Sequence, residues 1–346
     1  MHLTAMLPDL LTFADGRPVR APEEWPARRA ELLQALLDIQ YGHLPPAPEA
    51  VSAYPLYTYA LFRDEGVNGT HYRLTMQPGG YAFHLQVVMP AGEGPFPLVI
   101  DGDGCWRKTL TDDVLRAVTG RGYALAIFNR VEIVPDRLTP RDTGLYTAYP
   151  GDYGALAAWA WAYHRVVDAV PQLGAIDPAR VIVTGHSRGG KTALLAGATD
   201  ERIALTAPNN SGCGGAGCYR FPDESGERLA DLLRNIPYWF APRLRDFLDR
   251  EAELPFDQHS LKAAVAPRAL LTTEARGDHW ASPSGTRLTH EAAREVYRFL
   301  GAEHRIGIHY RDGGHAHTLA DWHTLLDFAD TVFDGKPMSR DFDMHP

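Results

Sequence analysis

The chain has 346 residues, of which 45% are hydrophobic and 22% charged, as is usual for a globular protein with a sizeable core. Its formal net charge is −9 and it contains no block of consecutive Lys and Arg, which argues against a nucleic-acid backbone as partner. No apolar run reaches the length of about 18 residues that a membrane span needs, so the sequence predicts no membrane partner.

The N-terminal residues and the cysteines bear on the compartment. The chain does not begin with a basic segment followed by a long apolar run, so we expect no secretory signal. Cys105, Cys213 and Cys218 are odd in number and lack metal-ligand spacing. We expect reduced thiols, with a Cys213–Cys218 bridge as the weaker alternative, and a cytoplasmic location if no leader precedes this sequence. The oligomeric state is not predicted.

The first third of the chain predicts one helix and then strands. Residues 1 to about 50 are rich in Pro, and residues 23–42 carry leucines at helical spacing. Three segments with alternating polarity follow, each bounded by Gly or Pro, and they predict antiparallel strands at residues 56–64, 69–78 and 81–90. Residues 96–104 predict a buried strand that ends in a turn of Gly and Asp.

The remaining chain alternates between strand and helix. Strands are predicted at residues 123–129, 179–185, 202–210, 267–275 and 304–311. Helices are predicted at residues 111–122, 152–170, 188–200, 284–301 and 318–333, with loops and short helices between residues 213 and 266. This alternation predicts a mostly parallel, doubly wound sheet with antiparallel N-terminal strands. We expect one α/β domain over residues 1–346, with residues 1–50 as an N-terminal helical extension.

The segment Gly185-His186-Ser187-Arg188-Gly189 fits the G-x-S-x-G pattern between a predicted strand and a predicted helix. That context is typical of the nucleophile turn of the α/β-hydrolase fold, a three-layer αβα sandwich. The glycines fit this turn because side chains two residues on either side of the serine would clash. Ser187 is therefore the predicted nucleophile.

A serine hydroxyl needs a base, and in this fold the acid and then the histidine follow the serine along the chain. After the last predicted strand we favour His315 over His317 as the base, because Gly313-Gly314 precede it in a flexible loop. After the preceding strand we favour Asp278 over Glu274 as the acid, because Asp278 lies in the loop and Glu274 still lies in the strand.

Two cations follow the predicted nucleophile. The backbone N–H of Arg188 is an expected oxyanion donor, and its guanidinium could face the same developing charge, although a surface ion pair is the alternative. Lys191 lies four residues after Ser187, on the same helix face, where an ammonium suits a polar substrate. The alternative is a helical lysine whose ammonium extends to solvent.

The stretch VIVTGHSRGGKTALLAGATDERIALTAPNNSGCGGAGCYR, residues 181–220, resembles the glucuronoyl esterases, whose nucleophile turn carries Ser-Arg-x-Gly-Lys. The resemblance extends from about residue 80 to the C-terminal segment GGHAHTLADWHTLLDFAD. It implies hydrolysis of esters of 4-O-methyl-glucuronic acid, which join xylan to lignin alcohols. It also implies Ser187 as nucleophile, Arg188 as oxyanion stabiliser, Lys191 as a ligand of sugar hydroxyls and Trp280 as a uronate contact, with a core tryptophan as the alternative for Trp280.

Two positions depart from the family pattern. Many members carry their catalytic Glu just before the Ser-Gly loop, where this chain has Asn210. Some bacterial members use an Asp in a later Asp-x-Trp segment instead, and Asp278 fits that pattern. His186 stands where fungal members carry a Cys, so the resemblance implies no disulfide at that point.

The predicted function is a serine carboxylic-ester hydrolase acting on small or oligosaccharide esters of glucuronic acid. An acetyl-xylan or general carboxylesterase is the first alternative, and a non-catalytic carbohydrate-binding module on a hydrolase fold is the second. The sequence implies no metal and no organic cofactor, because His, Cys and carboxylates do not cluster at ligand spacing.

Overall fold

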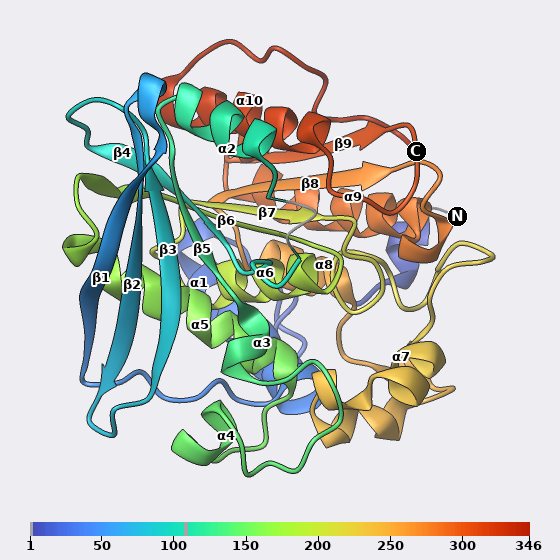
Figure 1. The fold of residues 1–346 in the computed structure, drawn as a ribbon. Coiled ribbons are helices and arrows are strands. Elements are labelled where there is room, and N and C mark those ends of the chain that lie inside the picture. Colours follow the sequence, from blue (N-terminus) through green and yellow to red (C-terminus); the bar gives the residue numbers. More distant parts are fainter. Residues whose placement is uncertain (1–2, 107–109) are drawn as a thin grey trace.

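A mixed β-sheet forms the centre of the computed structural model, which describes residues 3–106 and 110–346 (Figure 1). Within these residues the sheet has nine strands in the order β1-β2-β3-β5-β4-β6-β7-β8-β9. The strands are β1 (Ala50–Phe62), β2 (Val67–Gln77), β3 (Ala82–Met89), β4 (Phe96–Asp101), β5 (Ala124–Phe128), β6 (Ile176–His186), β7 (Leu205–Asn209), β8 (Ala269–Ala275) and β9 (Ile306–Arg311).

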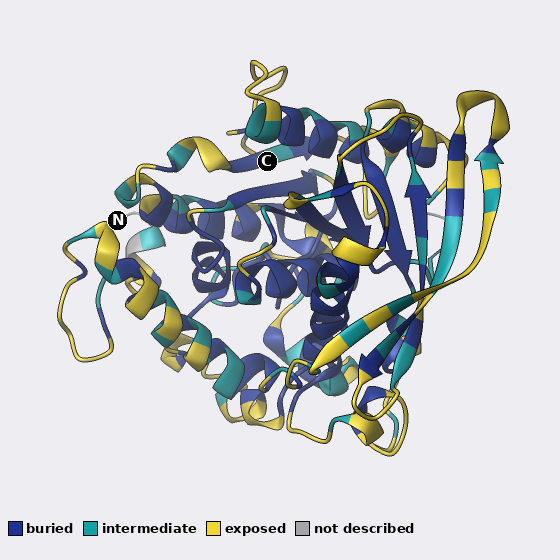
Figure 2. Cartoon of the chain, turned by 90° about the vertical axis from the view of Figure 1, so that its left-hand side faces the viewer, coloured by how far each residue is buried: buried dark blue, intermediate teal, exposed yellow. Residues whose placement is uncertain are grey.

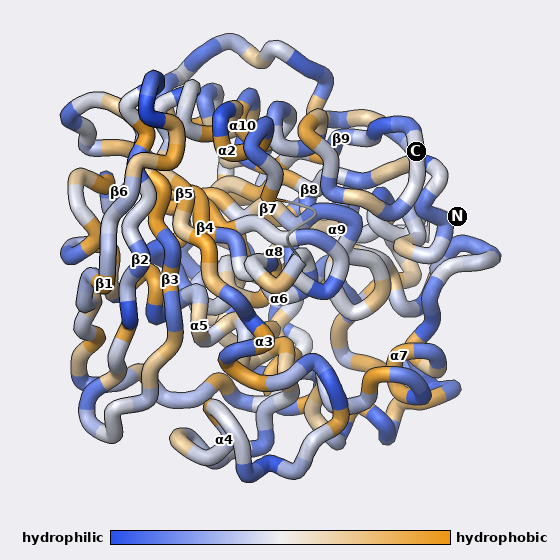
Figure 3. Tube along the Cα trace, in the orientation of Figure 1, coloured by the Kyte–Doolittle hydropathy of each residue, from blue (hydrophilic) through white to orange (hydrophobic). Residues whose placement is uncertain are grey.

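The sheet has an antiparallel part and a parallel part, as predicted. β1, β2 and β3 pair antiparallel with one another, and β3 pairs antiparallel with β5. From β5 to β9 all neighbours are parallel, so their carboxyl ends meet at one edge. β4 and β5 lie inside the sheet and consist of continuous apolar runs (Figure 3). Such runs are typical of strands that are covered on both faces.

Helices cover both faces of the sheet. They are α1 (Trp25–Leu36), α2 (Asp112–Gly120), α3 (Arg130–Ile133), α4 (Leu145–Ala148), α5 (Ala155–Ala169), α6 (Arg188–Thr199), α7 (Leu229–Asn235), α8 (Gln258–Ala263), α9 (Pro283–Phe299) and α10 (Leu319–Asp334). Apolar side chains of α2 and α10 pack in the core on one face, and those of α1, α5, α6 and α8 pack in the core on the other (Figure 1).

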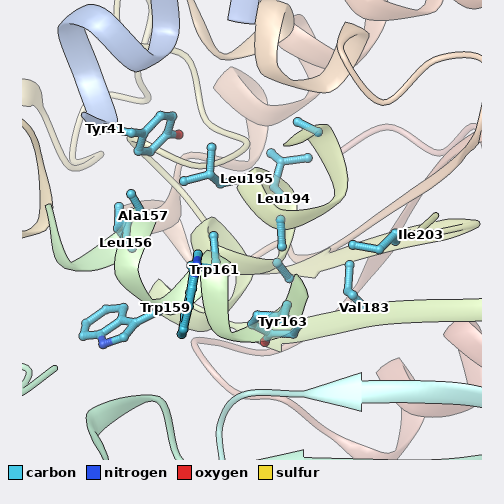
Figure 4. Close-up of a cluster of buried hydrophobic side chains, with 14 of the residues drawn as sticks. Tyr41, Leu156, Ala157, Trp159, Trp161, Tyr163, Val183, Leu194, Leu195 and Ile203 are labelled. Atoms are coloured by element: carbon cyan, nitrogen blue, oxygen red, sulfur yellow. The ribbon is translucent and has the colours of Figure 1, made fainter. Parts of the chain in front are cut away.

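The larger core lies between the sheet, α5 and α6. Figure 4 shows part of this core, with Trp159 and Trp161 of α5, Leu194 and Leu195 of α6 and Val183 of β6 among its buried side chains. The indole N–H of Trp159 donates to Val134 O at 3.0 Å, so the ring is buried without a lost hydrogen bond. β5, β7 and β8 are buried throughout and α5 is buried except at Asp168, whereas β1 and β2 expose much of their length (Figure 2). The packing of α5 and α6 against β6 gives the strand-to-helix turn at Ser187 a rigid base.

The predicted fold class is confirmed, and the differences are local. β1 begins at Ala50, not at residue 56, because Val51 and Ala53 extend the antiparallel ladder opposite Met76 and Leu74. The short helices α3 and α4 were not predicted, since four residues are too few to show a helical period. The three cysteines carry free thiols, so Cys213 and Cys218 are not bridged. No helix in the described ranges has the length and hydropathy to cross a membrane.

Candidate active site

Ser187 lies in a strained turn between the end of β6 and the start of α6. Its φ of 58° and ψ of −120° are unfavourable for a residue with a side chain, and its N–H donates to Asn209 O at 2.9 Å. A Cβ on Gly185 would come within 2.6 Å of the backbone of Gly189, and a Cβ on Gly189 would come within 2.3 Å of the Asp103 carboxylate. The two glycines of the motif therefore allow the close approach of strand and helix.

His315 and Asp278 form a hydrogen-bonded pair beside this turn. Asp278 follows β8 and His315 follows β9, and both strands end at the same edge of the sheet as β6. His315 Nδ1 lies 2.6 Å from Asp278 Oδ2, the geometry that orients an imidazole with Nε2 free. Ser187 and His315 line the same cavity. The structure thus brings together the three predicted catalytic side chains.

The Asp278 carboxyl is ionised in this environment. Burial by itself would raise its pKa, but hydrogen bonds from the side chains of His315 and Asn210, together with the charge of His315, lower the pKa below its usual value. Asn210 Nδ2 donates to Asp278 Oδ2 at 2.8 Å. A carboxylate held in this way is suited to stabilise a protonated imidazole.

The two alternatives for base and acid occupy different surroundings. Glu274 is fully buried, and within the described chain neither of its carboxylate oxygens accepts a well-formed hydrogen bond. Burial raises its pKa well above the usual range, against the opposing charge of Lys262. His317 stacks on Trp322 with ring centroids 4.9 Å apart, and burial lowers its pKa to about 3. In the described residues neither side chain takes part in the His315–Asp278 pair.

The Arg188 guanidinium lies between two indole rings and one carboxylate. Its Cζ is 5.3 Å from the ring centroid of Trp106 and 4.9 Å from that of Trp239. Nη1 donates to Asp136 Oδ2 at 2.7 Å, so the ion pair of the alternative interpretation exists, although both side chains are partly buried. Nε is buried and meets no acceptor within the described residues. The Nε–H of the guanidinium is therefore not committed to a protein acceptor.

Lys191 is buried, with 4% of its surface exposed, and its ammonium is held by the protein. Nζ donates to Ser211 O at 2.6 Å and to Cys213 O at 2.7 Å, and it lies 3.4 Å from Glu227 Oε2. An ammonium has three donors, and these contacts account for all of them. Lys191 lines the cavity, but a sugar hydroxyl would have to compete with Glu227 for its ammonium.

The cavity beside Ser187 has a volume of about 340 Å³. Trp280 is 51% exposed and forms part of its wall, so the alternative of a core tryptophan is wrong. Glu227, Asn235 and Trp239 also line it and were not predicted. Glu227 and Asn235 lie in the stretch read as loop and short helices, where no periodic pattern marks individual residues. The cavity offers a flat aromatic face, a carboxylate and an amide to a polar ligand.

Comparison with known proteins supplies independent information. The family model described as fungal glucuronyl esterase matches residues 74–301. The chain is 32% identical over 327 residues to 4-O-methyl-glucuronoyl methylesterase 1 of Wolfiporia cocos (strain MD-104), covering 90% of this chain and 76% of that relative.

Two solved structures extend the likeness to the fold. A carbohydrate esterase family 15 glucuronoyl esterase from Caldicellulosiruptor kristjansonii matches with a TM-score of 0.86 and 33% identity, covering 98% of this chain and 93% of that one. A mutant glucuronoyl esterase from Sporotrichum thermophile, in complex with methyl 4-O-methyl-beta-D-glucopyranuronate, matches with a TM-score of 0.79 and 27% identity. The second match covers 96% of this chain and 88% of that one.

Proposed function

The chain belongs to the glucuronoyl esterase family, and from this premise we propose that it hydrolyses esters of (4-O-methyl-)glucuronic acid with Ser187, His315 and Asp278 as its catalytic residues. The observation that carries the proposal is the 2.6 Å hydrogen bond between His315 Nδ1 and Asp278 Oδ2, because His315 and Ser187 line the same cavity. The predicted cytoplasmic location remains a prediction.

The proposed chemistry is acyl transfer in two steps. Ser187 Oγ attacks the ester carbonyl while His315 Nε2 takes its proton, and His315 then gives that proton to the departing alcohol. Water then attacks the acyl-enzyme carbonyl with His315 again as base, the bond between the acyl carbon and Ser187 Oγ breaks, and His315 returns the proton to Oγ as the uronic acid leaves. Asp278 holds the tautomer with hydrogen on Nδ1 and stabilises the charge that His315 acquires in each step.

Arg188 is proposed to stabilise the oxyanion. It is the first residue of α6, and the backbone N–H at that position has no acceptor within the helix. The uncommitted Nε–H of its guanidinium is a further donor. Asp136 fixes the guanidinium from the other side, so the donors are oriented before charge develops.

Recognition of the sugar is proposed to use two neighbouring residues that line the cavity, Trp280 and Glu227. The exposed indole of Trp280 gives a flat apolar face for a pyranose ring. Glu227 can accept hydrogen bonds from sugar hydroxyls, and Lys191 orients its carboxylate. In this arrangement Lys191 acts on the sugar chiefly through Glu227.

A general carboxylesterase is the second candidate function, and one observation favours it. The three N–H donors of the Lys191 ammonium are taken by protein acceptors, so the ammonium is not free to bind the substrate. Such an enzyme would use the same three catalytic residues without a preference for the uronate.

The test is an ester panel that varies the acyl part while the alcohol is kept the same. Methyl glucuronate, methyl 4-O-methyl-glucuronate and methyl galacturonate are compared with methyl acetate by kcat/KM, with the Ser187→Ala variant as the blank. A strong preference for the glucuronates supports the proposal. Equal activity on acetate supports the general esterase, and failure of a fluorophosphonate to label Ser187 in the native protein supports a non-catalytic module.

A further inference from the structure

Three aromatic side chains lie in a row behind His315. The ring centroid of His186 is 4.5 Å from that of His315 and 5.8 Å from that of His317. His317 in turn lies 4.9 Å from Trp322. The planes of His186 and His317 differ by 19° and those of His317 and Trp322 by 20°, so these rings are stacked. We call His186, His317 and Trp322 the ring column.

His186, the member of the ring column next to His315, is held firmly. Its backbone N–H donates to Asp103 Oδ2 at 2.7 Å, and its Nδ1 lies 2.6 Å from Asn209 Oδ1. Asn209 Nδ2 donates to Thr273 Oγ1 at 2.9 Å, which assigns the amide oxygen as the acceptor for His186. His186 therefore carries its hydrogen on Nδ1, and only 4% of its surface is exposed.

His315, in contrast, is held by few contacts. Its side chain is 40% exposed, and it follows Gly313 and Gly314, of which Gly313 has a φ of 104°. In residues 3–106 and 110–346 the ring has one hydrogen bond, to Asp278, and one ring contact, to His186. One hydrogen bond leaves the imidazole free to rotate about that bond, so the contact with His186 determines where Nε2 points.

We propose that His186 is a positioning residue: its ring, supported by His317 and Trp322, keeps the His315 imidazole in the orientation that directs Nε2 toward Ser187. The proposal rests on the proposed function, in which His315 is the base. It assigns to His186 a role that the nucleophile motif leaves open, since the residue between the glycine and the serine can be of any type.

The ring column also stays uncharged during the reaction. Burial, and then the neighbouring His317, lower the pKa of His186 to about 3, against the hydrogen bond to Asn209. Burial and the charge of Arg311 lower the pKa of His317 to about 3 as well. When His315 takes the proton of Ser187, it therefore faces a neutral ring, and the ring column adds no like charge against the transfer.

The experiment compares three substitutions of His186 in the full chain. His186→Ala removes the ring, His186→Gln removes the ring but keeps an amide that can bind Asn209, and His186→Phe keeps a ring without the hydrogen bond. Loss of the ring misplaces the base, so we expect Ala and Gln to lower kcat on methyl glucuronate by about 10- to 100-fold. We expect KM to change by less than about twofold, and Phe to stay within about fivefold of the native kcat.

A second measurement reports position directly. The Nδ1–H proton between His315 and Asp278 is expected as a downfield resonance in the proton NMR spectrum of the native protein and of His186→Phe. In His186→Ala and His186→Gln we expect it to broaden or disappear. His304→Ala, which removes an exposed imidazole, is the matched control and should change neither kcat nor the resonance.

The outcomes separate this proposal from the proposed function. Native kcat in His186→Ala or His186→Gln would overturn the positioning role while leaving the esterase proposal intact. The proposal would also be overturned if His186→Phe were as slow as His186→Gln while both variants are folded. The ring of residue 186 would then not be sufficient to position His315. A native protein that neither hydrolyses the esters nor reacts with fluorophosphonate at Ser187 would refute the proposed function itself.

Discussion

Asn210 Nδ2 donates a hydrogen bond across 2.8 Å to Oδ2 of Asp278, the same oxygen that binds His315 Nδ1. Asn210 occupies the place where, by the family resemblance, many glucuronoyl esterases carry a Glu. In this chain Asn210 is therefore a neutral donor that supports Asp278, the acid that follows β8. Asn210 also has a φ of 42°, a conformation that Asn tolerates better than most residues.

Asn210→Asp should lower activity most at acidic pH. The new carboxylate would face Asp278, and two like charges in contact raise the pKa of the pair. The pair would then bind a proton at pH values at which Asp278 alone is ionised. We expect kcat/KM relative to the native enzyme to fall more at about pH 5 than at about pH 8. Asn210→Gly is the control, since Gly accepts the positive φ and only the hydrogen bond is lost, which costs about 1 kcal/mol. A uniform loss across pH in Asn210→Asp would contradict this explanation.

Asp278→Asn should abolish most of the activity while the protein stays folded. The amide removes the negative charge and favours the wrong His315 tautomer, and in a serine-protease triad the corresponding change costs about 10⁴-fold in kcat. Glu274→Gln is the matched control, because Glu274 is the neighbouring carboxyl that the chain order also offers. Burial raises the pKa of Glu274, so the amide replaces a protonated carboxyl of the same shape. Steady-state kinetics on methyl glucuronate that show an equal loss in both variants would remove Asp278 from the proposed triad.

The order of strands and motifs is sufficient to predict the proposed catalytic set. Ser187, Asp278 and His315 each follow a strand of the parallel part of the sheet, and parallel strands end at one edge. The choice of Asp278 over Glu274 depended on whether the residue lies in the strand or in the loop, and β8 does end at Ala275. The proximity of Ser187, Asp278 and His315 therefore follows from the topology, and the order of strands in the sequence predicts it.

The walls of the cavity could not be predicted in the same way. The spacing of Lys191 from Ser187 predicts the helix face on which it lies, but the carbonyls of Ser211 and Cys213 that hold it belong to the loop after β7. Glu227 is positioned by a backbone hydrogen bond from its N–H to Trp280 O. Such contacts join segments far apart in the chain, and no periodicity in the sequence records them.

His317→Phe should make the stability of the protein less sensitive to acid. Burial and Arg311 lower the pKa of His317 from 6.5 to about 3, so between these pH values the unfolded chain binds a proton that the folded chain does not. The free energy of unfolding therefore falls as pH decreases from about 6.5 toward 3. Phe has no such proton and keeps the stack on Trp322, so the loss between about pH 7 and pH 5 should shrink by about 2 kcal/mol.

Urea unfolding of native protein and His317→Phe at both pH values measures this difference. His304→Gln is the control for the removal of an exposed imidazole. An unchanged slope in His317→Phe would mean that His317 titrates similarly in the folded and unfolded chains.

Lys191→Met should separate recognition of the uronate from the chemical step. Methionine has similar length but no donor, so the carbonyls of Ser211 and Cys213 and the carboxylate of Glu227 lose a buried partner. Each unsatisfied group costs about 1–3 kcal/mol, and the free energy of unfolding should fall accordingly. Glu227 would no longer be oriented toward the sugar, so we expect kcat/KM for methyl glucuronate to fall about 10- to 100-fold, mainly through KM.

The control in this case is the substrate. An acetate ester has no hydroxyls for Glu227 to bind, so its kcat/KM should stay within about threefold of the native value. Within the described residues, the ammonium of Lys191 bonds to Ser211, Cys213 and Glu227 and not to the three proposed catalytic side chains. Glu227→Gln should reproduce the selective loss with a smaller effect on stability, since Lys191 keeps both carbonyl acceptors. If Lys191→Met lowers kcat/KM equally for both substrates, the residue supports the loop at Ser211 and Cys213 as a whole. Selectivity for the uronate must then come from Trp280 and the other residues that line the cavity.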